Sequence, residues 1–186
     1  MVYFAFKGFS GGSQTYKMFV QDETIKWEVY AFEANPEFNQ VLAEVTTEVE
    51  KRNYSMKMFV ETAAWTQDGI IDFYLDTVNT RKHFWGSSID ENHPDVIQSK
   101  KKKVTVKCVD IANILRQYNE NDLVIVKMDI EGAEYDLLLD FIKKDVYKLV
   151  DYLAIEFHRQ VHRFKTPEDV FIEVLKLYGT NFVKWN

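Results

Sequence analysis

Four groups of residues stand where the chain leaves an apolar run, and their types are those that bind ligands or move protons. A carboxylate at the end of a strand can accept two hydrogen bonds from a ribose diol. Carboxylates beside an imidazole suit proton transfer or the binding of a divalent cation. The four groups are Gly8 and Gly11 in a loop, Glu33 after the second apolar run, Asp129 after a later one, and Glu156 with His158 after another.

Asp129, Glu156 and His158 form the candidate catalytic set. Glu156 and His158 are two residues apart, so in an extended segment their side chains point to the same face. His158 is the best candidate for a general base, because its unperturbed pKa lies near neutrality. The same three side chains also offer a ligand set for Mg²⁺ or Mn²⁺. The sequence leaves both a metal site and a metal-free site open.

Further candidates come from polar and aromatic residues elsewhere in the chain. Glu131 and Glu134 are three residues apart and are predicted to share one face of a helix start, where acidic side chains favour the helix dipole. Glu134 is predicted to bind a ligand or to hold the structure, and both alternatives stay open. His93 lies in a polar segment with no visible partner set. The candidate substrate-binding residues are Trp85, Ser87, Ser88 and His162.

The elements that must position these residues alternate between strands and helices, which is typical of a mostly parallel sheet covered by helices. Ligands of such sheets bind outside the carboxyl ends of the strands. A hairpin turn is predicted at Asp68-Gly69 and a long loop over 77–103. The predicted strands are 2–6, 27–32, 56–60, 71–75, 104–108, 123–128, 149–157 and 182–185, and the predicted helices are 13–20, 36–45, 111–115, 135–143 and 166–177.

Composition restricts the class of protein. The 186 residues, 46% of them hydrophobic, fit one domain over 1–186. The net charge of −6 argues against a nucleic-acid binder, although Lys100–Lys103 is a basic run. No apolar run approaches the roughly 20 residues of a membrane span, and no signal peptide is expected. The single cysteine, Cys108, is predicted to be buried and fits a reducing compartment, so we expect a cytoplasmic protein without membrane contact.

One stretch is specific enough to indicate a family. Lys127–Glu134 reads K-M-D-I-E-G-A-E and resembles the signature of the FkbM-type methyltransferases at every position. Ala31–Pro36 is similar to the family's A-F-E-P-N-P, and Leu153–His158 is similar to its L-x-I-E-x-H. Weaker similarities are found at Ala63-Ala64, Asp68-Gly69, Phe73-Tyr74, Ser87-Ser88 and Val106–Leu115. The resemblance covers most of the chain from about residue 28 onward.

The resemblance implies an α/β fold of the class I (Rossmann-like) methyltransferases, with a mostly parallel twisted sheet and helices on both faces. It implies S-adenosylmethionine as the methyl donor and O-methylation of a hydroxyl group, with a sugar of a glycan or glycoconjugate as the expected acceptor. It suggests Glu33 for the ribose, Ala63 and Ala64 near the adenine, and Asp129 beside the amino-acid end of the donor or the acceptor. The donor-binding residues predicted are Gly8, Gly11, Glu33, Ala34, Asn35, Ala63, Ala64, Asp129 and Glu134.

The first motif of the family departs from its usual form. When Ser10–Ser13 is set against the family's loop, Ala5 takes the place of an acid and Lys7 the place of a glycine. This departure motivates one alternative, a methyltransferase-like binding module without catalysis. Another alternative is an NAD-dependent Rossmann oxidoreductase, which would also use Glu33 but which usually carries G-x-G-x-x-G, absent here. A homodimer that completes the site is also left open.

Overall fold

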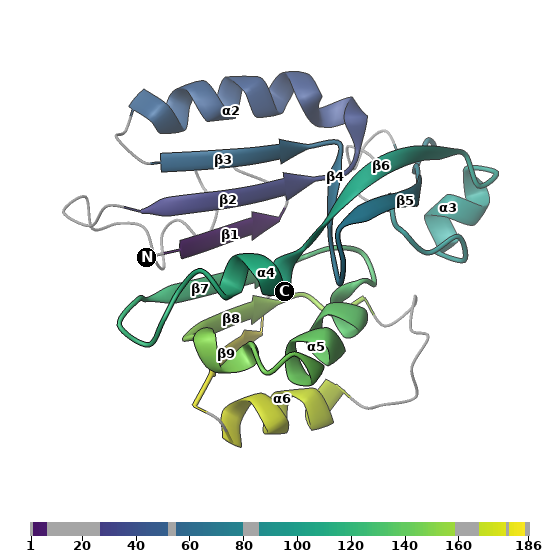
Figure 1. Ribbon diagram of the computed structural model, residues 1–186. Coiled ribbons are helices and arrows are strands. Elements are labelled where there is room, and N and C mark those ends of the chain that lie inside the picture. The colour runs from purple at the N-terminus through teal and green to yellow at the C-terminus, as the bar shows by residue number, and fades with distance from the viewer. Residues whose placement is uncertain are drawn as a thin grey trace.

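The larger of two sheets holds six parallel strands in the order β3-β2-β1-β7-β8-β9 (Figure 1). The computed structural model describes residues 2–6, 27–51, 55–79, 86–158, 168–177 and 179–184. The strands are β1 (Val2–Phe6), β2 (Glu28–Glu33), β3 (Ser55–Val60), β7 (Val124–Met128), β8 (Tyr152–Ile155) and β9 (Asn181–Lys184).

From β1, the strand order runs to β2 and β3 on one side and to β7, β8 and β9 on the other. The order along the chain therefore reverses between β1 and β7. In open α/β sheets, such a reversal leaves a crevice outside the carboxyl ends of the strands, and ligands bind there. All five residues of β7 are buried, as a central parallel strand requires. The prediction of a mostly parallel sheet is therefore confirmed, and its crevice lies directly after the strand that carries Asp129.

A smaller sheet stands beyond the carboxyl ends of β1, β2 and β3 (Figure 1). Its strands are β4 (Thr62–Trp65), β6 (Lys103–Asp110) and β5 (Gly69–Tyr74), in that order. The hairpin predicted at Asp68-Gly69 is wrong, because β6 lies between β4 and β5 and pairs with both. Asp68 instead accepts a hydrogen bond from the backbone N–H of Asp110, which ends β6.

The described helices pack mainly against the larger sheet. A core cluster joins side chains of α4, α5 and α6 to β2, β7 and β8, and Leu115, Leu137 and Leu138 in it are fully buried. Burying one such side chain stabilises the fold by about 1.5–3 kcal/mol. The helices are α2 (Asn39–Lys51), α3 (Pro94–Gln98), α4 (Ile111–Leu115), α5 (Glu134–Lys143) and α6 (Glu168–Leu177), with short 3-10 helices η1 (Pro36–Phe38) and η3 (Tyr147–Leu149).

The described part of the predicted loop 77–103 is more ordered than expected. Ser88 exchanges two backbone hydrogen bonds with Tyr74, and residues 94–98 form α3. The buried Asp76 carboxylate accepts hydrogen bonds from the backbone N–H groups of Val78 and Asn79. Burial acts to raise the pKa of Asp76, but these backbone hydrogen bonds bring it below its ordinary value. The segment is thus fixed by its own polar contacts.

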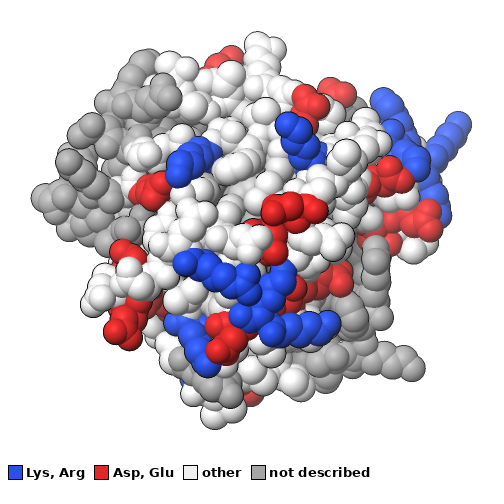
Figure 2. Space-filling model, in the orientation of Figure 1, with Lys and Arg blue, Asp and Glu red and all other residues white. Residues whose placement is uncertain are grey.

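The surface charge is mixed in sign. Acidic and basic side chains are interspersed on the face shown in Figure 2. Within the basic run, Nζ of Lys101 lies 3.3 Å from Oε2 of Glu91, and Nζ of Lys103 lies 2.5 Å from Oδ2 of Asp72. These acidic neighbours offset part of the charge of the run. Among the described residues, no helix has the length and apolar character needed to cross a membrane.

A substitution at Gly86 tests how tightly the segment before α3 is packed. A Cβ atom at Gly86 would lie 2.5 Å from the Cβ of Asp95, so Gly86→Ala must displace backbone. We expect a loss of about 1–3 kcal/mol in the free energy of unfolding, measured by urea denaturation. Asp95→Gly removes the clashing atoms, so it should restore part of that stability in the double variant. Additive losses would contradict the clash.

Candidate active site

A pocket that is partly open to solvent lies between the carboxyl ends of β2 and β7 and the smaller sheet. It stands at the edge where the sheet order predicts a ligand site. Seven residues that the sequence predicted for donor or substrate binding line it, and they come from four separate segments. These seven are Glu33, Ala34, Asn35, Ala63, Ala64, Ser87 and Asp129.

One wall of the pocket is fixed by hydrogen bonds around Asn35. Its backbone N–H donates to Oε1 of Glu33 at 2.8 Å, and its side-chain Oδ1 caps η1 by accepting from the N–H of Glu37. Its Nδ2 donates to Oγ of Ser87 at 3.1 Å, and this oxygen also accepts from the N–H of Asp76. Asn35 and Ser87 therefore shape the wall, and the hydroxyl of Ser87 is already engaged by the protein.

The facing wall is apolar. Ala34, Ala63 and Phe73 belong to the small core cluster of the second sheet, and Ile89 packs against it. The four alanines of the pocket lining leave room that larger side chains would fill. An apolar lining with a few fixed polar groups is the usual form of a small-molecule site.

The turn after β7 carries the acidic residues of the signature. Glu131 has a φ of 53° and Gly132 a φ of 103°, so the chain turns through the left-handed region before α5 begins at Glu134. Such a backbone is unfavourable for a non-glycine residue by about 1–2 kcal/mol and must be held by its surroundings. The prediction that Glu131 and Glu134 share a helical face is therefore wrong.

The carboxylate of Glu134 stabilises this turn by hydrogen bonds to its backbone. Its side chain is fully buried; Oε1 accepts from the N–H of Ile130 at 3.0 Å, and Oε2 accepts from the N–H of Gly132 at 2.9 Å. Its Oε1 also lies 2.9 Å from Nδ1 of His158. Glu134 is not part of the pocket lining, so of its two alternatives the structural one matches its place.

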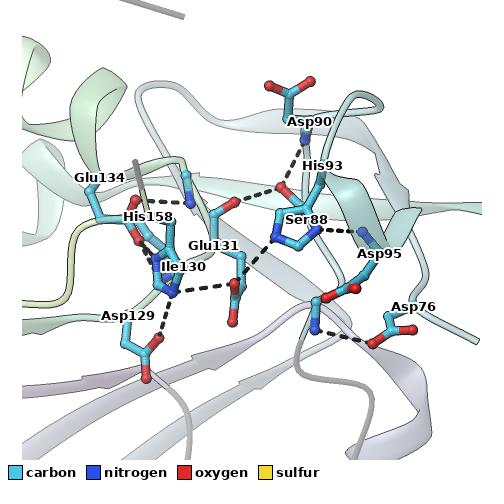
Figure 3. A network of polar contacts seen from close by, with 12 residues as sticks. Asp76, Ser88, Asp90, His93, Asp95, Asp129, Ile130, Glu131, Glu134 and His158 are labelled. Carbon is cyan, nitrogen blue, oxygen red and sulfur yellow. Dashed lines mark hydrogen bonds and ion pairs between the residues drawn. The ribbon is translucent and has the colours of Figure 1, made fainter. Parts of the chain in front are cut away.

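His158 is surrounded by carboxylates (Figure 3). Its Nε2 lies 3.3 Å from Oε2 of Glu131 and 3.9 Å from Oδ1 of Asp129. Burial lowers the pKa of His158, but the hydrogen bond and charge of Glu134, with the two other carboxylates, outweigh burial and raise the pKa to about 9. Without a bound cation, the ring therefore carries a proton near neutral pH. In that state it cannot accept the proton that the predicted role of general base requires.

The predicted metal ligands do come together. One possible ligand atom from each of Asp129, Glu156 and His158 lies within 4.8 Å of the other two. Burial, and after it the charge of Asp129, raise the pKa of Glu156. Lys127, also buried, lies 3.3 Å from Oδ2 of Asp129 and offsets one charge. Two carboxylates and one imidazole fit Mn²⁺ or Mg²⁺, with water completing the coordination.

The remaining predicted residues fall into two groups. Ser88 is fully buried and its Oγ donates to the backbone oxygen of Glu131 at 2.7 Å, so it fixes the turn and does not line the pocket. Gly8, Gly11, Trp85 and His162 lie outside the described residues.

Sequence reasoning missed two residues. Glu131 lines the pocket, although it was expected only on a helix surface. His93, for which no partner was expected, has its Nε2 3.6 Å from Oε2 of Glu131 (Figure 3). Neither had a local signal, because one depends on a left-handed turn and the other on a contact between distant segments.

The raised pKa of His158 makes stability depend on pH. The folded pKa of about 9 exceeds the ordinary 6.5, so the stabilisation is full below about 6.5 and is lost as pH rises through about 9. The expected loss is about 3 kcal/mol, measured by urea denaturation across that range in a chelator. His158→Gln should lack this dependence. Parallel curves for the wild type and the variant would disprove the shift.

Comparison with known proteins gives one match. The family model described as the methyltransferase FkbM domain matches residues 5–179. Searches of curated proteins and of solved structures find no significant match. The matched range includes the whole pocket lining and the cluster around His158. Since it also spans nearly all of the chain, this protein belongs to the FkbM methyltransferase family.

Proposed function

We propose that this methyltransferase transfers the methyl group of S-adenosylmethionine to a hydroxyl oxygen. The observation that carries the proposal is the pocket, in which Glu33 at the end of β2 and Asp129 at the end of β7 border the same space. These two strands flank β1, where the sheet order reverses. S-adenosylmethionine needs a group that accepts hydrogen bonds from its ribose diol and a polar group beside its charged end. Glu33 and Asp129 would supply these two groups at the expected edge of a Rossmann-like sheet.

The walls of the pocket support one orientation of the donor. Its ribose diol would meet Glu33, and its adenine would lie against Ala63 and Ala64. The sulfonium and the amino-acid end would then lie toward Asp129, where negative charge attracts them.

Methyl transfer to a hydroxyl oxygen requires the protein to align the two reactants and to remove one proton. Holding the acceptor oxygen in line with the methyl group supplies much of the rate. Asp129 lines the pocket, with Glu156 and His158 beside it, and would lie next to the acceptor hydroxyl. Asp129 or Glu156 would receive the proton, or all three residues would bind a divalent ion. A bound Mg²⁺ or Mn²⁺ would lower the pKa of the hydroxyl.

For the acceptor, we propose a sugar hydroxyl of a glycan or glycoconjugate in the cytoplasm. The family resemblance supports this choice. Trp85 and His162 stay candidate contacts to it, because an aromatic ring and an imidazole suit a sugar face. Ser87 is the other candidate, although its hydroxyl already bonds two protein groups.

A second candidate function is a donor-binding module without turnover. Ala5 is the observation that favours it, since this residue lies in β1 beside Ala31 of β2, close to the reversal of the sheet, and carries no carboxylate. The two candidates differ in turnover and agree on binding of the donor.

Calorimetric titration separates the two donor-binding candidates from the NAD-dependent oxidoreductase, and a turnover assay separates the two candidates from each other. We expect micromolar binding of S-adenosylmethionine and S-adenosylhomocysteine and none of NAD, because the pocket has a diol-binding carboxylate but the chain lacks G-x-G-x-x-G. Repeating the titrations with Mg²⁺ or Mn²⁺ tests the ion site, and Asp129→Asn should remove any effect of the ion. Binding of NAD alone, or of no ligand, would overturn the proposal.

Glu33→Gln tests the ribose contact. A neutral amide keeps the shape and one acceptor oxygen but loses a charge-assisted hydrogen bond, so affinity for S-adenosylhomocysteine should fall about 10-fold to 100-fold. Glu37→Gln is the matched control, because this exposed carboxylate lies one turn further along the chain. Equal affinity in wild type and Glu33→Gln would remove Glu33 from the donor site.

A further inference from the structure

His93 is a buried histidine whose two ring nitrogens face different partners. The residue is 2% exposed and precedes α3. Its Nδ1 accepts a hydrogen bond from the backbone N–H of Asp95 at 3.2 Å and so caps the helix. Because a nitrogen that accepts this bond carries no hydrogen, the proton of the neutral ring sits on Nε2. The fold of the segment therefore sets the tautomer.

The Nε2–H of His93 is aimed at the pocket-lining carboxylate of Glu131. It lies 3.6 Å from Oε2 of Glu131 and has no hydrogen-bond partner among the described residues. A buried donor without a partner is costly, and a shift of a few tenths of an ångström would complete this bond. Contacts in active sites are often long before the ligand binds and shorten in the complex.

Glu131 is held on its other sides as well. Ser88 donates to its backbone oxygen at 2.7 Å, and its Oε2 lies 3.3 Å from Nε2 of His158. The same oxygen thus stands between two imidazoles, one from the segment before α3 and one from the segment after β8 (Figure 3). His158 in turn is fixed at Nδ1 by Glu134. A continuous set of contacts therefore runs from α3 to the cluster around Asp129.

We propose that His93 is a positioning residue of this site: its Nε2–H orients the Glu131 carboxylate in the pocket, and through Glu131 it sets the place of His158. The proposal rests on the methyltransferase function proposed above for the same pocket. It gives the segment before α3 a part in the reaction beyond closing the pocket wall.

Two substitutions isolate the Nε2–H. His93→Gln keeps an N–H donor near the position of Nε2, whereas His93→Phe keeps the ring volume without any donor. Neither keeps the Nδ1 acceptor, so both lose the helix cap and their difference reports the contact with Glu131. Gln98→Ala is the control, since this residue is exposed on the same helix. The readouts are turnover, affinity for S-adenosylhomocysteine and the free energy of unfolding.

We expect His93→Phe to lower kcat about 10-fold to 100-fold, the usual range for removing the partner of a site residue. His93→Gln should keep most of the activity, and Gln98→Ala all of it. Affinity for S-adenosylhomocysteine should change little in each variant, because His93 does not line the pocket. Equal turnover of the Gln and Phe variants, or turnover that follows their loss of stability, would overturn the positioning role.

A spectroscopic readout tests the contact without relying on catalysis. In protein labelled with ¹⁵N-histidine, the ring of His93 should show the Nε2–H tautomer, and Glu131→Gln should shift its Nε2 signal. The Nδ1–H tautomer, or an unchanged signal in Glu131→Gln, would refute the contact. If the wild type binds no adenosyl ligand, the proposed function fails, and this spectrum still decides whether His93 holds Glu131.

Discussion

The buried carboxylate of Glu134 is the contact on which the rest of the site depends. Two of its interactions hold the backbone N–H groups of Ile130 and Gly132, and the third orients His158. A carboxylate in a fully buried position is tolerated only when its charge is met by several donors. The left-handed turn at Glu131 supplies two of them, and the imidazole supplies the third. The turn, the helix start and the histidine thus form one unit, in which each part satisfies the others.

This unit explains why so much negative charge can gather at the end of two strands. Strands β7 and β8 pair in parallel, so the residues that follow them must leave the sheet side by side. Asp129 and Glu131 come from one strand end, and Glu156 and His158 come from the other. Near neutral pH the imidazole and the ammonium of Lys127 offset part of the charge. The negative charge that is not offset favours a cation beside the pocket, either a metal ion or the positive end of a sulfonium donor.

The sequence predicted which strand ends border the site better than it predicted the contacts between the side chains of the site. Hydrophobic runs with polar ends placed Glu33 and Asp129 at strand ends along one edge of the sheet, because parallel strands share one direction. The family signature was also sufficient, and the family is confirmed. The sequence did not reveal β6 between β4 and β5, since periodicity says nothing about which strands pair. It also could not show Glu131 facing His93, because the left-handed turn and the tautomer depend on contacts between segments distant in the chain.

The pairing of β6 has a further consequence for the time at which the pocket forms. Ala63 and Ala64 lie in β4, which pairs with β6 and not with its own neighbour in sequence. Closing such a long loop is entropically costly and slow compared with forming a hairpin. The apolar wall is therefore incomplete until the chain up to Asp110 is in place. A nascent chain that stops before β6 already contains Glu33, but it lacks the strand with which Ala63 and Ala64 pair.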